Sequence, residues 1–467
     1  MSASADMASN RWSSERFGPD TAHWLPRTPD HLLDHIPGKD GLPILGNTLD
    51  QLRDYIGFVR QMVKDYGPVY RSNGFGGRSV TLHGPEANEL VMFDRDKLFS
   101  SEQGWGPMLN LLFPRGLMLM DFDKHRADRK TLSVAFKPEP MRHYADSLNE
   151  GIKARVADWS GKEIKFYPAI KSLTLDLAAT SFLGIPWGPE ADKINKAFVD
   201  MVQAAIGIVR RPLPFTAMGR GAAGRAYLVD YFSRLVPERR ASGGADIFSQ
   251  ICQATDEDGE YLSVEAIVDH MNFLMMAAHD TITSSLSSLV WELAKQPEWQ
   301  DRLREEMLAV APAGEGVGHN GINELELTEW AFKETLRLVP PVPTFPRRAL
   351  RDFSFGGYDI PAGTMVAVSP AFTHMMEEHW PNPTQFDPMR FSPEQARGRH
   401  KYAWVPFGGG AHMCLGLHFA YMQAKIFLHH VLTQYRIEAQ PGYDPKWAML
   451  PIPRPKDGLK LRFVPLN

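Results

Sequence analysis

Cysteine is nearly absent from this chain of 467 residues, which contains only Cys252 and Cys414. Two cysteines are too few for the disulfide framework of a small secreted protein, so their scarcity favours a reducing compartment. The first 37 residues are polar and lack the apolar core of a signal peptide. We therefore expect a cytoplasmic protein.

Long apolar runs and an excess of one charge are also missing. No stretch of about 18 apolar residues, the length that crosses a bilayer, occurs in the sequence. The 51 basic and 55 acidic residues give a net charge of -4, and no basic run stands out. These features predict a protein without a membrane anchor and without a nucleic acid as its main partner.

No shift in composition divides the chain, although its length alone suggests about three domains. The loosest stretches, residues 241–245 and 312–321, are short enough to be loops. Hydrophobic residues make up 43% of the chain, which is enough for one large core. The sequence therefore predicts a polar N-terminal extension over residues 1–36 and a single domain over residues 37–467.

Helical patterns dominate the rest of the sequence. The longest glycine- and proline-free stretch is 264–295, and it carries an apolar stripe at helical spacing. Short strands are predicted at 69–72 and 80–83, around a glycine-rich turn. The unusually apolar residues between Phe99 and Asp121 predict a loop. The fold class is therefore mainly α with a small β lobe (α+β), with helices expected at 48–66, 86–93, 141–160, 173–183, 192–209, 264–295 and 330–339.

The glycine-rich loop 407–416 contains Cys414 and precedes a stretch, 417–428, whose apolar residues recur at helical spacing. A thiolate just ahead of a helix is stabilised by the helix dipole and by backbone N–H groups. Glycines let the backbone approach a flat ligand. Together these features are what an axial sulfur ligand of haem iron requires. The alternatives are a small buried cysteine and an ordinary glycine turn.

The pattern Phe-x-x-Gly-x-x-x-Cys-x-Gly in this loop resembles the haem-ligand loop of the cytochrome P450 family, the haem-thiolate monooxygenases. The resemblance extends from residue 37 to 463 and implies the cytochrome P450 fold for that catalytic domain. It implies haem b (iron protoporphyrin IX) as cofactor, with Cys414 as the axial ligand of the iron. It also implies haem contacts from the other loop residues, Phe407, Gly408, Gly410 and Gly416.

The resemblance implies a set of cationic side chains for the haem propionates, since cations pair with carboxylates. His125 and Arg129 are four residues apart and project from one helix face; a solvated charged face is the alternative. Arg347 follows a proline-rich turn where relatives place such an arginine, and the neighbouring Arg348 is the alternative register. His412, two residues before the cysteine, completes the set.

An acid and a hydroxyl, Asp280 and Thr281, interrupt the apolar stripe of the helix predicted at 264–295. Burying a carboxylate costs free energy unless it has a partner. The segment resembles the oxygen-activation motif of the family, which implies that these two catalytic residues organise proton delivery. Ala278 stands where glycine is usual, and Ile282 where threonine or serine is frequent. The alternative for Thr281 is a hydrogen bond to a carbonyl of the preceding turn.

Two further groups of residues are implied by the resemblance. Glu334, Arg337 and Arg390 match a structural triad of the family, for which a surface ion pair of small value is the alternative. The apolar segment before Asp121 matches the loop that shapes the substrate chamber, for which ordinary core is the alternative. The implied chamber residues are Leu109, Leu112, Phe113, Ala277, Val342 and Leu450.

The resemblance implies a monooxygenase that inserts one oxygen atom of O2 into a C–H bond of a terpenoid, steroid, retinoid or fatty-acid-like substrate. No flavin or iron–sulfur motif occurs, so electrons are expected from a ferredoxin or a flavodoxin-like protein with its reductase. We expect a monomer. The alternatives are a peroxygenase that uses hydrogen peroxide, against which the Asp280–Thr281 pair argues, and a haem-binding sensor or carrier without catalysis.

Overall fold

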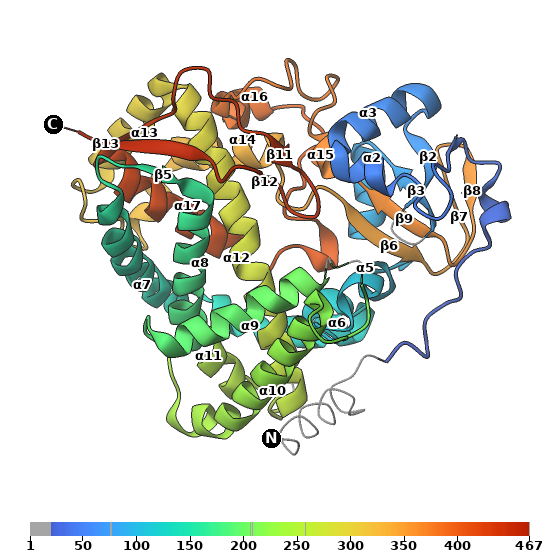
Figure 1. Ribbon diagram of the computed structural model, residues 1–467, viewed down its shortest axis with the longest axis horizontal. Helices are drawn as coiled ribbons and strands as arrows, with labels where there is room; N and C mark the ends of the chain where they lie inside the picture. Colours follow the sequence, from blue (N-terminus) through green and yellow to red (C-terminus); the bar gives the residue numbers. More distant parts are fainter. Residues whose placement is uncertain (1–19, 75–76, 206, 208, 257, 467) are drawn as a thin grey trace. The chain divides into compact units, whose positions relative to one another are not determined.

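Helices make up most of the chain in the computed structural model, which describes residues 20–466 apart from 75–76, 206, 208 and 257 (Figure 1). Contacts divide the chain into two units, and each is described separately. Unit 1 comprises Met1–Leu25, Ser100–Ser147 and Leu175–His279. Unit 2 comprises Pro26–Phe99, Leu148–Thr174 and Asp280–Asn467. The single domain expected over residues 37–467 stays a prediction.

Unit 1 is built from helices, and α7, α8 and α12 contribute residues to both units. The helix α12 has the bounds that its glycine- and proline-free sequence predicts. Within this unit α9 and α10 lie in close contact, because a Cβ atom at Gly221 would come within 2.4 Å of the Ala204 Cβ. The helices are α5 (Ser101–Leu109), η3 (Leu117–Leu119), α6 (Phe122–Leu132), η4 (Ser133–Phe136), α7 (Pro138–Val156), α8 (Phe166–Leu183), α9 (Pro189–Ala205), α10 (Ala217–Ser242), α11 (Ile247–Gln253) and α12 (Val264–Lys295).

Unit 2 holds most of the described β-structure; Ser100, at the end of β4, and an isolated bridge between Thr255 and Tyr261 belong to unit 1. Its main sheet has the strand order β1-β2-β3-β9-β6-β4 and packs against a core that includes Val80, Val366 and Val368. The strand β3 runs parallel to β9 and antiparallel to β2. These strands are β1 (Gly38–Lys39), β2 (Val69–Asn73), β3 (Arg78–Leu82), β4 (Phe99–Ser100), β6 (Phe345–Ala349) and β9 (Met365–Val368). The other strands form small sheets: β5 (Glu163–Lys165), β10 (Tyr435–Glu438) and β13 (Lys460–Pro465); β7 (Phe353–Phe355) and β8 (Tyr358–Ile360); β11 (Trp447–Ala448) and β12 (Arg454–Pro455).

The helices of unit 2 include α17, which follows the glycine-rich loop and is buried along most of its length. The predicted fold class, mainly α with a small β lobe, is confirmed. The helices are η1 (Asp30–Leu33), α2 (Thr48–Arg53), α3 (Tyr55–Tyr66), α4 (Pro85–Asn88), η2 (Glu89–Phe93), η5 (Ala157–Trp159), α13 (Pro297–Val310), η6 (Gly321–Glu324), α14 (Glu326–Leu338), α15 (Pro370–Thr373), η7 (Pro388–Phe391), α16 (Pro393–Ala396), η8 (Gly410–His412) and α17 (Leu417–Leu432).

The helix expected over 192–209 ends at Ala205, and residues 206 and 208 of that range lie outside the described residues. Two other predicted segments differ from the structure. The loop expected between Phe99 and Asp121 contains the helix α5, because the Ser100 hydroxyl accepts a hydrogen bond from the Gln103 N–H at 2.9 Å and caps it. The single helix expected over 48–66 is divided at Asp54, whose backbone is extended (φ -154°, ψ 87°) and whose carboxylate caps α3. In both cases a capping side chain decides where the helix begins.

The predicted triad forms a buried network in unit 2. The Arg337 guanidinium donates to both Glu334 oxygens at 2.7 and 2.8 Å, and Arg390 Nε lies 3.3 Å from the same carboxylate. The Asp387 N–H donates to it as well, at 3.0 Å. Glu334 and Arg337 are fully buried. The alternative of a surface ion pair is therefore wrong.

Replacing Glu334 with Ala is expected to prevent efficient folding, because two buried guanidinium groups lose their carboxylate. The free energy of unfolding should fall by about 3–5 kcal/mol, a large share of the roughly 5–15 kcal/mol that stabilises a typical domain. Soluble yield and urea unfolding measure the effect. The control Glu89→Ala removes an exposed partner of Arg95 and should change stability by less than about 1 kcal/mol. Equal stability of the two variants would show that the network does not support the fold.

Candidate active site

The glycine-rich loop 407–416 folds back on itself in unit 2. The Cys414 N–H donates to the Phe407 carbonyl at 2.9 Å, and the Cys414 side chain is exposed shortly before α17 begins. The Phe407 ring packs against Tyr421 of α17 and against Trp404, with ring centroids 5.6 and 6.2 Å apart. The protein's own contacts therefore fix the position of the cysteine.

Glycine is required at two positions of this loop for different reasons. Gly410 has a φ of +60°, and a Cβ there would lie 2.5 Å from the Met92 carbonyl oxygen. Gly409 is extended, but a Cβ would lie 2.5 Å from the Phe93 ring. Because Met92 and Phe93 belong to η2, this helix packs directly against the bare backbone of the loop.

A histidine that the sequence did not single out connects this loop with the triad. His374 Nε2 accepts a hydrogen bond from the Val405 N–H at 3.0 Å, and the His374 carbonyl accepts one from Arg337 at 2.8 Å. Burial lowers the pKa of His374 to about 3, so its ring stays neutral and keeps an acceptor nitrogen. The triad thus holds the residues that lead into the cysteine loop. No local sequence pattern marks His374 for this role.

Strand alternation separates the two candidate arginines of β6. Arg348 donates to the Gly363 carbonyl at 2.9 Å, whereas Arg347 points to the other face, which it shares with Phe345. A Cβ atom at Gly408 would lie 3.6 Å from the Phe345 ring. Arg347 therefore lies on the same face of β6 as Phe345, the residue that lies next to Gly408 of the cysteine loop.

Asp280 is buried and has an ion-pair partner in unit 2. Lys171 Nζ of α8 lies 2.8 Å from Asp280 Oδ1, and Asp280 is only 6% exposed. The Lys171 side chain is 27% exposed and so reaches solvent. A second contact between the same helices joins the hydroxyls of Thr174 and Thr283 at 2.7 Å. The structure thus supplies the partner that a carboxylate in an apolar stripe requires.

Comparison with known proteins decides the family. The profile of the cytochrome P450 family matches residues 36–463. The chain is 37% identical over 446 residues to cytochrome P450 136 of Mycobacterium tuberculosis, which covers 94% of this chain and 90% of the relative. The chain belongs to the cytochrome P450 family. The predicted resemblance is confirmed, and the protein is a haem-thiolate monooxygenase.

This cytochrome P450 is also similar to a plant relative and to a solved structure. It is 30% identical over 448 residues to a beta-amyrin 28-monooxygenase of Solanum lycopersicum, with 92% of each chain covered. The solved structure of retinoic acid-bound cyanobacterial CYP120A1 matches with a TM-score of 0.84 and 29% identity, over 92% of this chain and 99% of that chain. The predicted fold is therefore confirmed.

The cofactor of this P450 is haem b, which the family binds through a cysteine thiolate. The loop 407–416 fits this group: the Cys414 side chain is exposed, and Gly408 and Gly410 take left-handed conformations (φ +71° and +60°) that keep side chains off its backbone. Cys252 differs in every respect, because it is fully buried and burial raises the pKa of its thiol to about 12.

Three predicted propionate contacts are placed on two short elements. His125 and Arg129 lie one turn apart on α6 in unit 1, where His125 is buried and Arg129 is half-buried. His412 is half-buried in η8 of unit 2, next to the exposed Met413. The helical spacing expected for His125 and Arg129 is therefore present. Their role toward haem stays a prediction.

The predicted chamber residues fall in both units. In unit 1, Leu109, Leu112 and Phe113 are buried and Ala277 is half-buried. In unit 2, Val342 and Leu450 are half-buried, and Leu450 packs against a small core of Tyr55, Val59 and Ala371. The burial of the first three also fits ordinary core, so a shared chamber stays a prediction.

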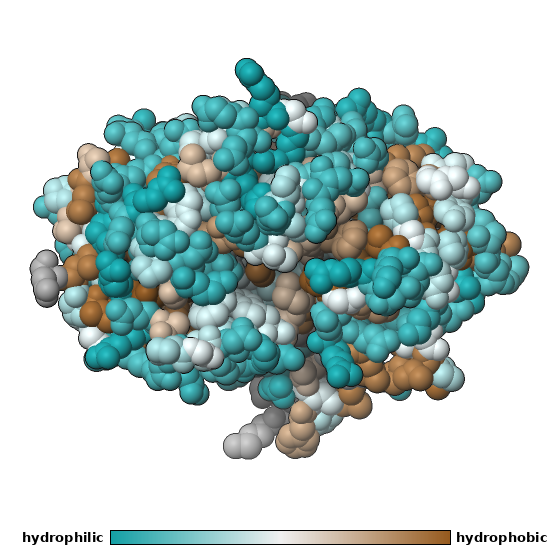
Figure 2. Space-filling view, turned by 90° about the horizontal axis from the view of Figure 1, so that it is seen from above, coloured by the Kyte–Doolittle hydropathy of each residue, from teal (hydrophilic) through white to brown (hydrophobic). Residues whose placement is uncertain are grey.

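No helix in the described part of the chain is long and apolar enough to cross a membrane. Figure 2 shows one face of the molecule, where hydrophilic residues cover most of the area and hydrophobic patches lie between them. The exposed large hydrophobic side chains include Ile44 and Phe215, which belong to different units.

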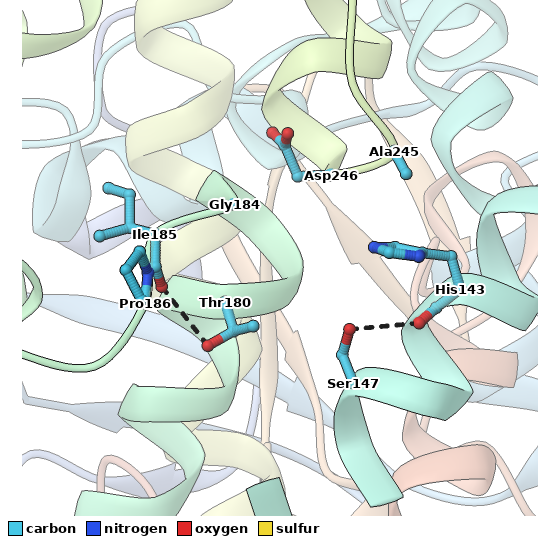
Figure 3. Close-up of a pocket in the computed structure, with 8 residues that line it drawn as sticks. All are labelled: His143, Ser147, Thr180, Gly184, Ile185, Pro186, Ala245 and Asp246. Carbon is cyan, nitrogen blue, oxygen red and sulfur yellow. Dashed lines mark hydrogen bonds between the residues drawn. The ribbon is translucent and has the colours of Figure 1, made fainter. Parts of the chain in front are cut away.

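A cavity of about 430 Å³ in unit 1 contains none of the predicted site residues (Figure 3). It lies beside α7 and α8, where Ser147 donates to the His143 carbonyl and Thr180 to the Ile185 carbonyl. The buried Asp246 side chain at its edge accepts hydrogen bonds from Arg239 and Ser249. The polar groups of this cavity are thus bound to their own backbone and neighbours.

Lys171→Met is expected to destabilise the protein, because the buried carboxylate of Asp280 loses its cation. The free energy of unfolding should fall by about 1–3 kcal/mol, as measured by urea denaturation of the haem-loaded protein. The double variant with Asp280→Asn should recover part of this loss, since a neutral amide needs no cation. Lys196→Met, which removes an exposed partner of Asp200, is the control. A loss that the second substitution does not reduce would contradict the pairing.

Proposed function

We propose that this cytochrome P450 oxidises a large hydrophobic substrate of the terpenoid or retinoid class, with Cys414 as the axial ligand of the haem iron. The observation that carries the proposal is the geometry of the loop 407–416, which presents an exposed thiol on bare backbone ahead of α17. Support for the substrate class comes from the names of relatives, which include a beta-amyrin 28-monooxygenase and a taxane 10-beta-hydroxylase, and from the retinoic acid bound to CYP120A1.

When bound, haem supplies the activation of dioxygen, which the electron-rich sulfur ligand favours. The protein's task is to hold and shield the group. The loop residues Phe407, Gly408, Gly410 and Gly416 would lie against it. Arg347 is favoured over Arg348 for a propionate, because it shares a strand face with Phe345, a neighbour of Gly408. His125, Arg129 and His412 would also bind the haem propionates.

Proton delivery would follow the sequence of groups Lys171, Asp280 and Thr281. The partly exposed Lys171 ammonium meets solvent, and the buried Asp280 carboxylate accepts its hydrogen bond at 2.8 Å. Asp280 would hold a proton from solvent and pass it toward the Thr281 hydroxyl, its neighbour in α12. The Thr281 carbonyl already accepts a bond from Ser285. This arrangement supports a monooxygenase that consumes protons over a peroxygenase.

Electrons would come from a separate redox protein. We propose a ferredoxin with its reductase as the donor, and a flavodoxin-like protein as the second candidate. The reducing compartment inferred from the two cysteines agrees with a cytoplasmic protein. We propose that it works as a monomer. Reconstitution with each donor, followed by product formation from a terpenoid and retinoid panel, distinguishes these possibilities.

Cys414→Ser is expected to abolish the thiolate-type absorption spectrum of the reduced carbon monoxide complex, because serine supplies no thiolate to the iron. Cys252→Ser, a matched control that changes the buried thiol, should leave the spectrum intact. The measurement is the absorption spectrum of each purified, haem-loaded variant. A normal spectrum for Cys414→Ser, or its loss in Cys252→Ser, would overturn the assignment of the ligand.

Thr281→Ala removes the hydroxyl but keeps a good helix former, so the fold and the haem should survive. We expect the variant to consume reductant and oxygen and to release most of the consumed oxygen as hydrogen peroxide. Oxidised product should be about 10²-fold lower than in the unaltered protein. Peroxide and product are measured per electron donated, with the same donor and substrate for both proteins. Unchanged coupling would leave Thr281 as a packing residue of α12.

A further inference from the structure

A buried charge cluster in unit 1 has no part in the proposed chemistry. Asp269 of α12 is fully buried and accepts hydrogen bonds from two arginines. Arg225 of α10 donates to Asp269 Oδ1 at 2.9 Å. Arg115 reaches Oδ2 through Nε at 2.9 Å and through Nη2 at 2.8 Å. A carboxylate bound in this way by two guanidinium groups is strongly held in one orientation.

The cluster also holds the chain between α5 and η3, which we call the 110–116 segment. Besides Asp269, Arg225 donates to the Leu112 carbonyl at 3.2 Å through Nη1. The same guanidinium therefore binds both the carboxylate of α12 and the backbone of the 110–116 segment. Since Arg225 is only 1% exposed, water does not compete for these bonds.

Close packing also holds the end of the 110–116 segment against α12. A Cβ atom at Gly116 would lie 2.5 Å from the Phe273 Cβ of α12, so the backbone there touches the helix. Arg115 itself has a φ of +54°, in the left-handed region that few residues other than glycine adopt. Its ion pair with Asp269 Oδ2 opposes the tendency of the backbone to leave this conformation.

The three charged residues differ in how much the fold depends on them. Arg225 and Asp269 are both enclosed, and removal of either would strand a buried charge. The Arg115 side chain is 32% exposed, and its removal leaves Asp269 still paired with Arg225. Arg115 is therefore the member of the cluster that can change without unfolding the unit.

We propose that Arg115 is a positioning residue, which binds the Asp269 carboxylate beside Arg225 and thereby holds Leu112 and Phe113 in place in the wall of the substrate chamber. The inference rests on the proposed function and on the predicted chamber, of which Leu112 and Phe113 are two of the residues. Arg115 touches no substrate itself. It acts on ligands through the 110–116 segment, so a ligand with a large apolar body is affected and a small ligand of the iron is not.

Two ligands with the same iron-binding ring test this inference. Full-length, haem-loaded protein is titrated with imidazole and with 1-dodecylimidazole, and the shift of the haem absorption band is followed. In Arg115→Gln the Kd of 1-dodecylimidazole should rise about tenfold, or ~1.4 kcal/mol, mainly through faster dissociation. The Kd of imidazole should stay within about twofold. Arg115→Lys, which keeps the charge, should restore part of the affinity.

The control Arg126→Gln removes an arginine of α6 from an exposed pair with Asp123 and should leave both Kd values unchanged. Amide hydrogen exchange in the 110–116 segment should be faster in Arg115→Gln than in the control. An unchanged Kd for 1-dodecylimidazole, equal weakening of both ligands, or loss of haem from Arg115→Gln would overturn the inference. If the unaltered protein shows no band shift with imidazole, the proposed function fails instead.

Discussion

A charge inside an apolar interior has to be paired, and this constraint recurs wherever the chain brings its distant segments together. Glu334 is enclosed with Arg337 and Arg390, Asp280 with Lys171, and Asp269 with two arginines. In each case at least one partner comes from a separate element, so satisfying the charge also fixes how those elements pack. The first network leads through His374 to the cysteine loop, which makes the placement of the thiol a consequence of a pairing far from it in sequence.

The three pairings differ in how far their members are exposed to solvent. The triad has no exposed member, as expected of a framework that must not move. The Lys171 and Arg115 side chains are instead 27% and 32% exposed, so each of these ion pairs has one partner in contact with water. A partner that reaches water can exchange hydrogen bonds with it at small cost. The proton relay and the ligand fit that we propose therefore both involve a pair with an open side, whereas the closed network is the rigid one.

Patterns that are local in sequence were predicted well. The helix 264–295 has no glycine or proline and carries a regular apolar stripe, so the sequence predicts both of its ends. The cysteine loop is recognisable from its glycines and from the spacing of the family motif. The helix α5 was missed because its capping signal, Ser100, precedes an apolar run without clear periodicity. Lys171 was missed for another reason: it lies 109 residues from Asp280, and only the folded chain joins them. The same holds for Arg225 and Asp269.

The contacts of the cysteine loop with η2 have a consequence for how this protein can diverge. At Gly409 the obstacle to a larger residue is the ring of Phe93, so a smaller side chain at 93 would make room for one, and the two positions can change as a pair. At Gly410 the obstacle is the backbone of Met92 and Phe93, and the left-handed φ adds strain, so no exchange elsewhere compensates. Two adjacent glycines thus differ in evolutionary freedom: one can covary with its neighbour, and the other is fixed for as long as the loop keeps this shape.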